Sequence, residues 1–538
     1  MTINLIRDEW LPVVTRRGQR RRIAPWQLTE DHDGNDPIVA LSTDRPDFRS
    51  SLQQFLIGLL QTAIPPSRAD AQTWTGPLLR APEPAALRKS LEPLSPVFDL
   101  HSDGPMFMQD LDLLSDGTEV DAAALLIDSP GKQSVRNNAD FFVKRGRVKG
   151  LCPPCAAIAL FTLQTNAPAG GSGIRTSVRG GGPLTTLITI DPSSMEKLEP
   201  TLWRESWLNV IDREELADAA PVQAKAQDPR VFPWLAATRT SEHPGGVETT
   251  PNDAHPLQAY WGMPRRMRID WTGDQAGVCD LCGDHAESLV TRYRTRPRGV
   301  NYTGPWRHPL SPYYSSDPAK PALPLHPQPG GIGYRHWLML AGEATSTSQP
   351  AAVVRAFRTR MQLAGRHIPP RLHVSGYDME NMKPRCWYES TMPIFTVEST
   401  VRDDFSDTMQ RLIDGAQQTA RKLRLCIRDA WIDNAPNGDL THLDKAFYGA
   451  TEAEFFRLAH AIAASLGSGG DAEAATLTWR GVLRREATSL FTRQAAPAGF
   501  EYGDPRRVAS AHQSLRRFLY NTLPRLLGIT DATEVNET

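Results

Sequence analysis

Two Cys-x-x-Cys pairs constrain the fold of this chain more than any other feature. They are Cys152 with Cys155 and Cys279 with Cys282, and 123 residues (156 to 278) lie between them. Each pair can supply two of the four ligands of a tetrahedral zinc ion, so together they fill the coordination shell and leave no position for water. The pattern therefore predicts a structural Zn²⁺ that ties distant segments together. The alternative is two unrelated reduced pairs.

Length and composition indicate an ordinary globular protein. The chain has 538 residues, enough for two to four domains, with 22% charged residues and a net charge of −1. There is no apolar run of eighteen residues and no secretory signal, and the cysteine pattern favours a reducing cytoplasm, so we expect a cytoplasmic protein without a membrane partner. The near-neutral charge excludes a protein that coats nucleic acid over its whole surface, but it permits binding along a stripe.

Positive charge is concentrated around the first cysteine pair, in Gly131–Pro183. This stretch contains one acid, Asp140, and eight basic residues: Lys132, Arg136, Lys144, Arg145, Arg147, Lys149, Arg175 and Arg179. Two glycine-rich runs, 170–173 and 180–182, predict loops whose backbone can approach a ligand closely. The adjacent Phe141 and Phe142 either belong to the core or stack on bases. Lysines, arginines and an open backbone together favour nucleic-acid binding.

A second arginine stretch follows the second cysteine pair. Residues 291–307 contain five arginines and no acid, interleaved with Tyr293, Tyr302 and Trp306. A zinc ion that joins the cysteine pairs would hold this stretch against the first basic one. The remaining arginine run, residues 16–22, is interpreted as a solvated hairpin tip.

The coarse pattern predicts a mixed N-terminal part and a helical C-terminal part. The predicted elements are a hairpin over 11–23, helices over 49–63, 155–161 and 353–363, a strand over 184–190 and a strand over 372–377 that ends in a turn. Four amphipathic helices follow, over 405–431, 451–465, 472–491 and 505–523. The predicted fold class is thus α+β, with a mixed domain over 1–388 and a four-helix bundle over 389–538.

Motifs for catalysis are missing from the sequence. The histidines show no His-x-x-x-His spacing, and the glycine runs match neither a phosphate loop nor a dinucleotide fingerprint. Cys386 and Cys426 stand alone and are interpreted as small buried hydrophobes. We therefore expect a binding protein rather than an enzyme. Two alternatives are a metal-dependent nucleic-acid enzyme and a zinc-stapled RNA-binding scaffold that does not read DNA.

Several segments together resemble the CasA family, the large subunit of the type I-E CRISPR surveillance complex Cascade. They are NLIRDEWLPV, IAPWQL, DPIVALSTDRPDFRSSLQQFLIGLLQTA, CPPCAAIALF, NAPAGGSG, SVRGGGPLTTL and WRHPLSPYY. The resemblance implies a non-catalytic subunit at the 5′ handle of the crRNA, in contact with the other Cascade subunits. It further implies recognition of the protospacer-adjacent motif (PAM) in double-stranded target DNA from the minor groove, help with unwinding and R-loop formation, and recruitment of the helicase–nuclease in antiviral defence.

The resemblance also implies roles for particular residues. The loop that contacts the handle and the motif falls on 138–149, and the residues assigned to it are Asn138, Phe141, Phe142, Lys144 and Arg145. The glycine loop of the family falls on Ala169, Gly170, Gly171, Ser172 and Gly173. Arg296 or Arg298 stands where the family inserts a lysine into the minor groove. The wedge, a Gly-Tyr turn followed by an inserting residue, falls on Gly376 and Tyr377 with Glu380, Asn381 and Met382, where either Asn381 or Met382 inserts.

Overall fold

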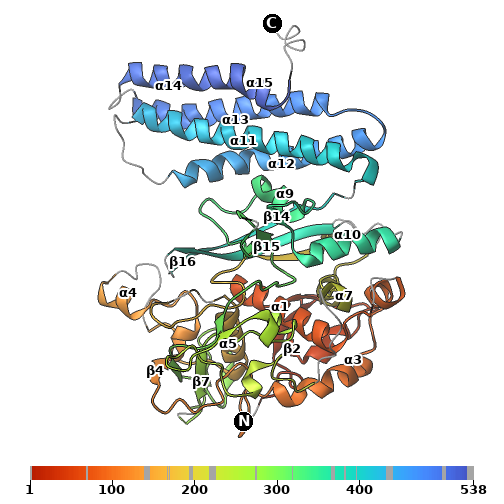
Figure 1. Ribbon diagram of the computed structural model, residues 1–538, viewed down its shortest axis with the longest axis vertical. Coiled ribbons are helices and arrows are strands. Elements are labelled where there is room, and N and C mark those ends of the chain that lie inside the picture. Colours follow the sequence, from red (N-terminus) through yellow and green to blue (C-terminus); the bar gives the residue numbers. More distant parts are fainter. Residues whose placement is uncertain are drawn as a thin grey trace. The chain divides into compact units, whose positions relative to one another are not determined.

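The computed structural model describes most of the chain: residues 3–67, 71–138, 146–166, 168, 170–192, 198–216, 226–272, 275–317, 319–364, 370–380, 383–395, 397–431, 440–499 and 504–529. It is an α+β protein, as predicted, with small sheets and a helical C-terminal region (Figure 1). Within the described residues, no helix is long and apolar enough to cross a membrane.

Internal contacts divide the chain into two units. Unit 1 comprises Met1–Pro327 and Thr345–Tyr388, and unit 2 comprises Gln328–Ala344 and Glu389–Thr538. The short elements of unit 1 are α2 (Gly76–Leu79), α3 (Pro84–Leu91), α4 (Lys132–Arg136), α6 (Leu202–Trp207), α7 (Arg213–Leu216), α8 (Gln258–Trp261), β6 (Glu248–Thr249), β8 (Gly277–Val278), β9 (His285–Ala286), β11 (Asn301–Tyr302), β12 (Tyr313–Tyr314), β13 (Leu323–Pro324) and β14 (Ser348–Gln349).

The N-terminal part of unit 1 forms the predicted hairpin and helix. Strands β1 (Leu11–Thr15) and β2 (Arg20–Ile23) pair antiparallel, and β3 (Ile38–Leu41) pairs with the other edge of β1. Helix α1 (Pro46–Ala63) starts three residues before the predicted helix, because Pro46 is well suited to a first helical position. The helix is buried on nearly all sides, and Phe55 makes edge-to-face contacts with Trp10, Phe98, Phe107, Phe161 and Trp261.

The central sheet of unit 1 has the order β16-β15-β5. Its strands are β5 (Thr185–Ile190), β15 (Pro370–Glu380) and β16 (Lys383–Pro393), and helix α5 (Pro153–Asn166) precedes β5 in the chain. β15 runs antiparallel to β5, with Pro370 opposite Ile190 and Ser375 opposite Thr185. The predicted helix over 353–363 is also present, as α10 (Ala352–Ala364).

The prediction of a turn at Gly376 and Tyr377 is wrong. Both residues lie inside β15, which continues to Glu380. Glycine is required at 376 because a Cβ there would lie 2.7 Å from the carbonyl oxygen of Pro183. Tyr377 is buried, and its hydroxyl donates a hydrogen bond of 2.7 Å to Asp47. The sequence pattern Gly-Tyr thus marks a close approach of two backbones and not a chain reversal.

A second sheet, of order β4-β10-β7, carries the arginine stretch. It contains β4 (Thr118–Asp121), β7 (Arg266–Asp270) and β10 (Arg292–Arg296). In the register of β10 and β7, Arg294 lies opposite Arg268 and Arg296 lies opposite Arg266. Directly opposed residues project from the same face of a sheet, so one face of this sheet is rich in arginine.

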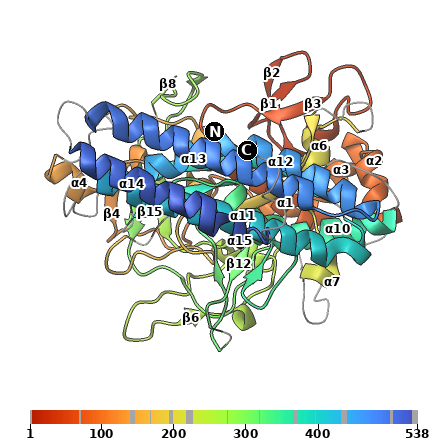
Figure 2. The same ribbon diagram turned by 90° about the horizontal axis from the view of Figure 1, so that it is seen from above.

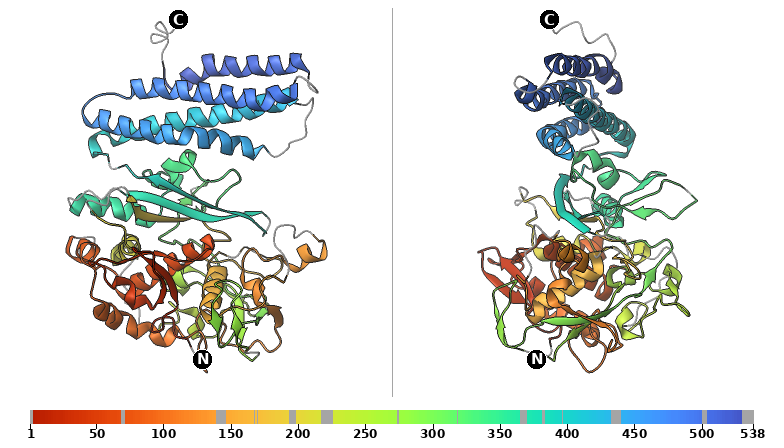
Figure 3. Two further views of the ribbon diagram at one scale, coloured as in Figure 1. Left: turned by 180° about the vertical axis from the view of Figure 1, so that it is seen from behind. Right: turned by 90° about the vertical axis from the view of Figure 1, so that its left-hand side faces the viewer.

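Unit 2 contains the predicted C-terminal helices. They are α11 (Arg402–Trp431), α12 (Thr441–Gly467), α13 (Glu473–Gly499) and α14 (Pro505–Arg517), which continues through a π-helical segment (Phe518–Thr522) into α15 (Leu523–Leu526). α11 packs against α12, α13 and α14, and Figures 2 and 3 show the four helices running alongside one another. The segment 328–344, which contains α9 (Trp337–Ala341), also belongs to this unit. Its Tyr334 ring stacks on Phe455, and the hydroxyl groups of Tyr334 and Thr451 share a hydrogen bond of 2.8 Å.

Candidate metal centre and nucleic-acid interface

The four predicted cysteine ligands meet in one cluster. The sulfurs of Cys152, Cys155, Cys279 and Cys282 all lie within 4.8 Å of one another, and the Cys152 and Cys282 sulfurs are 3.7 Å apart. A tetrahedron with zinc–sulfur bonds of about 2.3 Å has sulfur–sulfur edges of roughly 3.8 Å. Three of the cysteines are buried and Cys282 is exposed. The cluster therefore has the donor set and the size of a closed zinc site.

Backbone contacts join the two segments that carry the cysteines. Leu151 and Val290 exchange two hydrogen bonds of 2.8 and 3.0 Å. The Asp280 carboxylate accepts hydrogen bonds from the backbone N–H groups of Lys149 and Gly150. Gly283 adopts a φ of +78°, and its N–H bonds to the carbonyl of Cys279, which closes the second knuckle. The protein thus holds the ligands together through its own backbone as well.

The cysteine thiols differ in acidity because of hydrogen bonds within the cluster. A hydrogen bond from Cys155 lowers the pKa of Cys282 to about 7, and a hydrogen bond from Cys152 lowers the pKa of Cys279. Hydrogen bonds with Cys152 and the other cysteines raise the pKa of Cys155. The second knuckle therefore contributes the sulfurs that ionise most readily, which is the form that binds metal.

Arg22 is a member of this site that the sequence interpretation missed. Its Nη2 lies 3.3 Å from the Cys282 sulfur, 3.8 Å from the Cys152 sulfur and 2.7 Å from the Asp284 carboxylate. Burial lowers the pKa of Arg22, but the nearby negative charges, led by that of Cys152, together outweigh this effect, so that the pKa is raised overall. Arg16, Arg17 and Arg20 are exposed, as expected for a hairpin tip. Nothing in the arginine run distinguishes Arg22, whose partners are more than a hundred residues away.

The glycine loop at 170–173 contacts the second arginine stretch. Gly170, Gly171 and Ser172 are exposed, whereas Ala169 lies outside the described residues. The backbone N–H of Arg298 donates a hydrogen bond of 2.5 Å to the Gly173 carbonyl. Gly173 has a φ of +78°, and a Cβ there would lie 2.7 Å from Cγ of Arg298. Glycine is therefore needed at 173 both for its backbone conformation and for the close contact with Arg298.

The C-terminal end of the glycine-rich segment, at Gly182, contacts the end of β15. Gly182 has a φ of +60°, and a Cβ there would lie 2.8 Å from Cγ of Met379 and from the Tyr377 carbonyl oxygen. The segment from Gly173 to Gly182 therefore connects two of the predicted DNA-reading elements, the arginine stretch and the strand that leads to the wedge residues. Asn381 and Met382 themselves lie outside the described residues.

Buried Arg179 anchors the same segment. Its side chain is 1% exposed and donates hydrogen bonds to Thr185, Ser311 and Gln54, at 3.1, 3.3 and 2.5 Å. Burial lowers the pKa of Arg179 to about 10, which leaves it protonated at neutral pH. Arg179 is one of the eight basic residues predicted to form a basic patch, but it lies in the interior and cannot contribute to such a patch. Its role is to fix the shape of the glycine-rich loop.

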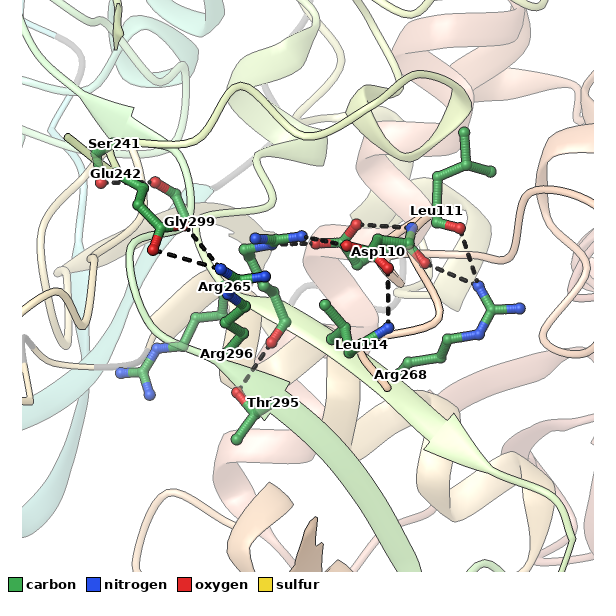
Figure 4. Close-up of polar contacts among 12 residues, drawn as sticks. Asp110, Leu111, Leu114, Ser241, Glu242, Arg265, Arg268, Thr295, Arg296 and Gly299 are labelled. Atoms are coloured by element: carbon green, nitrogen blue, oxygen red, sulfur yellow. Dashed lines mark hydrogen bonds and ion pairs between the residues drawn. The ribbon is translucent and has the colours of Figure 1, made fainter. Parts of the chain in front are cut away.

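Arg296 and Arg298 have different surroundings. The Arg296 guanidinium is ion-paired with Asp116 at 3.0 Å. It is also ion-paired with Glu242 at 3.1 Å (Figure 4). Arg298 is exposed with a φ of +64°, and its side chain has no hydrogen-bonding partner among the described residues. Ser241 supports this turn, since its N–H lies 3.1 and 3.2 Å from the carbonyl oxygens of Arg298 and Gly299 and its hydroxyl accepts a hydrogen bond from Arg175.

The remaining predicted residues are only partly described. Glu380 pairs with Arg385 at 3.3 Å, and Arg385 also pairs with Asp378 at 2.7 Å, so one guanidinium offsets part of the negative charge next to the wedge. Asn138 is exposed just after α4, with a φ of +49°. Phe141, Phe142, Lys144 and Arg145 lie outside the described residues. The roles assigned to all these residues stay predictions.

Comparison with known proteins identifies the family. The family model for the CRISPR-associated protein Cse1 matches residues 4–490. The chain belongs to this family. This confirms the resemblance inferred from the sequence motifs, since CasA and Cse1 are two names for one protein in the solved structures.

Solved structures share the fold over nearly the whole chain. Thermobifida fusca Cse1 has a TM-score of 0.67 and 16% identity, with 98% of this chain and 99% of that chain covered. Thermus thermophilus CasA has a TM-score of 0.65 and 15% identity, with 96% and 99% covered. A chain of a CRISPR RNA-guided surveillance complex has a TM-score of 0.65 and 14% identity, also with 96% and 99% covered. At these identities the likeness shows a shared fold.

Proposed function

We propose that this Cse1 family member is the large subunit of a type I-E Cascade complex, where it reads the protospacer-adjacent motif in duplex DNA. The proposal is supported by the family match and by the likeness to a chain of an RNA-guided surveillance complex. In this role the subunit contacts the crRNA 5′ handle and the other Cascade subunits, helps to start unwinding and R-loop formation, and recruits the helicase–nuclease.

One observation carries the DNA-reading part of the proposal: an exposed glycine loop is bonded to the backbone of an exposed arginine, Arg298, whose side chain has no described partner. Backbone N–H groups of the loop can approach phosphates or base edges without obstruction by side chains. An unpaired guanidinium is attracted to the negative potential of a narrow minor groove. We therefore assign the minor-groove role to Arg298 and not to Arg296, whose guanidinium already bonds two carboxylates.

Minor-groove readout limits the selectivity that such a site can reach. The minor groove distinguishes mainly A·T from G·C pairs. A reader composed of one glycine loop, one arginine and one wedge is thus expected to accept several related motifs. Because Met379 in β15 lies against Gly182, we propose that the wedge residues, which follow Met379 in the chain, enter the duplex beside the loop that reads it.

We propose that zinc occupies the four-cysteine cluster as a structural cofactor. When bound, the metal would be held by Cys152, Cys155, Cys279 and Cys282, and it would fix the two knuckles without an open coordination position. Among the described residues, no other group of three or more histidine, cysteine or acidic side chains has metal-binding geometry. A metal with four cysteine ligands has a structural part in the proposed function.

The variant Arg298→Ala tests the proposal. In the assembled complex, we expect the affinity for a motif-containing duplex to fall roughly tenfold, because one arginine contact to the groove is worth about 1–3 kcal/mol. Arg20→Ala, which removes an exposed arginine of the β1–β2 hairpin, serves as the matched control. Equal duplex binding by both variants, together with loss of crRNA from the Arg298 variant, would favour an RNA-binding scaffold instead.

A further inference from the structure

The arginine-rich face of the sheet β4-β10-β7 depends on acidic partners. Arg266 and Arg268 from β7 lie opposite Arg296 and Arg294 from β10. Like charges directly opposite each other destabilise a sheet, so this face requires compensating groups. Most of them come from the segment 110–119, which precedes and enters β4, and Glu242 supplies one more (Figure 4).

The partners of Arg266 and Arg268 are structural. Arg266 pairs with Asp110 at 2.6 Å, and both side chains are almost fully buried. Arg268 donates hydrogen bonds to the backbone carbonyls of Asp110 and Leu111. Removing one member of a buried pair is strongly destabilising, because the other charge is left without compensation. These contacts hold the loop on the sheet and are not available to a ligand.

Arg296 differs because its contacts are open to solvent. Its side chain is 30% exposed, while those of Asp116 and Glu242 are 64% and 38% exposed. Exposed ion pairs of this kind contribute about 0–1 kcal/mol and can be exchanged for other partners. Arg296 also lies two residues before Arg298, the exposed arginine next to Gly173. A phosphate that approaches Arg298 would therefore come close to Arg296, whose guanidinium is already paired with two carboxylates.

We propose that Asp116 and Glu242 restrain Arg296 and thereby weaken the attraction of this surface for duplex DNA that lacks the motif. The two carboxylates and one guanidinium carry a net charge of −1, so the group repels phosphate until the arginine is released. A duplex positioned by the glycine loop and Arg298 has the contacts to displace the carboxylates, whereas a duplex without the motif lacks them. Specificity then arises from a repulsive element as well as from an attractive one.

This inference rests on the proposed function and is tested in the assembled, crRNA-loaded complex. The variants are Asp116→Asn, Glu242→Gln and the double variant, each of which removes charge at nearly constant shape. Glu119→Gln is the matched control, because Glu119 pairs with Arg292 at the opposite end of β10. Affinities for short duplexes with and without the motif are measured over a range of salt concentrations.

In the double variant we expect the affinity for the motif-free duplex to rise about threefold to tenfold, with a smaller rise for the motif-containing duplex. The slope of log affinity against log salt should steepen by about 0.9, the value for one additional phosphate contact. Adding Arg296→Gln to the double variant should abolish both changes. Thermal unfolding of each variant checks that the fold is intact.

Two results would overturn the inference. If the double variant binds motif-free DNA no better than Glu119→Gln does, Arg296 is not restrained. If the affinity of the double variant for motif-free DNA falls, the carboxylates orient Arg296 for binding instead. In both cases the parent complex still discriminates between the two duplexes, and the proposed function survives. A parent complex that binds both duplexes equally would overturn the proposed function and this inference together.

Discussion

The cysteine cluster and the glycine loop lie at opposite ends of the same helix. Cys155 is in the first turn of α5, and the loop begins four residues after the helix ends at Asn166, so about 17 Å of helix separates them. The cluster is closed: its four sulfurs face one another and Arg22 and Asp284 cover one side. The loop is open, with exposed glycines beside an arginine whose side chain has no described partner.

The difference shows how one segment can serve stability and binding at once. At the cluster, polar groups satisfy each other and the backbone is cross-linked, so the ends of 150–155 and 279–290 are fixed. At the loop, the Arg298 guanidinium has no partner among the described residues, and buried Arg179 fixes the shape of the loop. Changes at the cluster should therefore affect folding first, and changes at the loop should affect binding first.

The largest expected effect is from removing a metal ligand. In Cys152→Ser, the zinc content should fall from about one ion per chain to none, and unit 1 should lose at least about 3 kcal/mol of stability, because the free energy of metal binding is coupled to folding. Zinc analysis and thermal unfolding measure both. Cys386→Ser is the control, because this lone cysteine is exposed and not buried as predicted, whereas Cys426 is buried as predicted. Unchanged zinc content in the Cys152 variant would contradict a four-cysteine site.

An intermediate effect, mainly on binding, is expected for Gly173→Ala. The added methyl group would meet Arg298, so the turn and the arginine must move, and the motif-containing duplex should bind about tenfold more weakly. Gly18→Ala is the matched control, because Gly18 has a similar positive φ of +83° and nothing within 4 Å of the added atom. Both variants pay the conformational cost of about 1 kcal/mol, which unfolding curves would show.

If the Gly173 variant bound DNA as tightly as the Gly18 variant, the contact between the glycine loop and Arg298 would have no part in reading the motif. If it lost zinc as well, the two ends of α5 would be more strongly coupled than the geometry indicates.

The smallest expected effect is from Arg22→Ala. The metal site should still fill, but zinc should transfer to a competing chelator several times faster, since hydrogen bonds to the thiolates and the positive charge are lost. Stability should fall by only about 1 kcal/mol. Arg22→Lys keeps the charge without the geometry of the guanidinium and should be intermediate. Zinc release at the parent rate in the alanine variant would limit Arg22 to its ion pair with Asp284.

Much of this architecture follows from local sequence signals. The hairpin, α1, α10 and α11 agree with the predicted elements to within a few residues, whereas α5 ends five residues later, α12 begins ten residues earlier and α13 ends eight residues later than predicted. The cysteine spacing correctly predicted that residues 152 and 279 come together. These features can be predicted from sequence because Cys-x-x-Cys motifs and the periodicity of amphipathic helices are short-range patterns.

Contacts over long sequence distances could not be predicted in the same way. Arg22 meets Cys282 across 260 positions, and Arg296 meets Glu242 across 54. Neither arginine differs in local sequence from its exposed neighbours, so its pairing is decided by tertiary packing. The Gly-Tyr pair in β15 was misassigned for the same reason, because the backbone of Pro183 that requires glycine at 376 is nearly two hundred residues away.

Buried Arg179 makes the glycine loop a poor candidate for transplantation. Its three described acceptors come from α1, β5 and the segment after Trp306, so the loop takes its shape from residues spread over more than 250 positions. Moving residues 170–182 into another scaffold would carry along a cation that needs those acceptors and is costly to bury without them. Engineers who wish to alter motif preference in this protein are better served by exchanging exposed residues around the loop than by moving the loop itself.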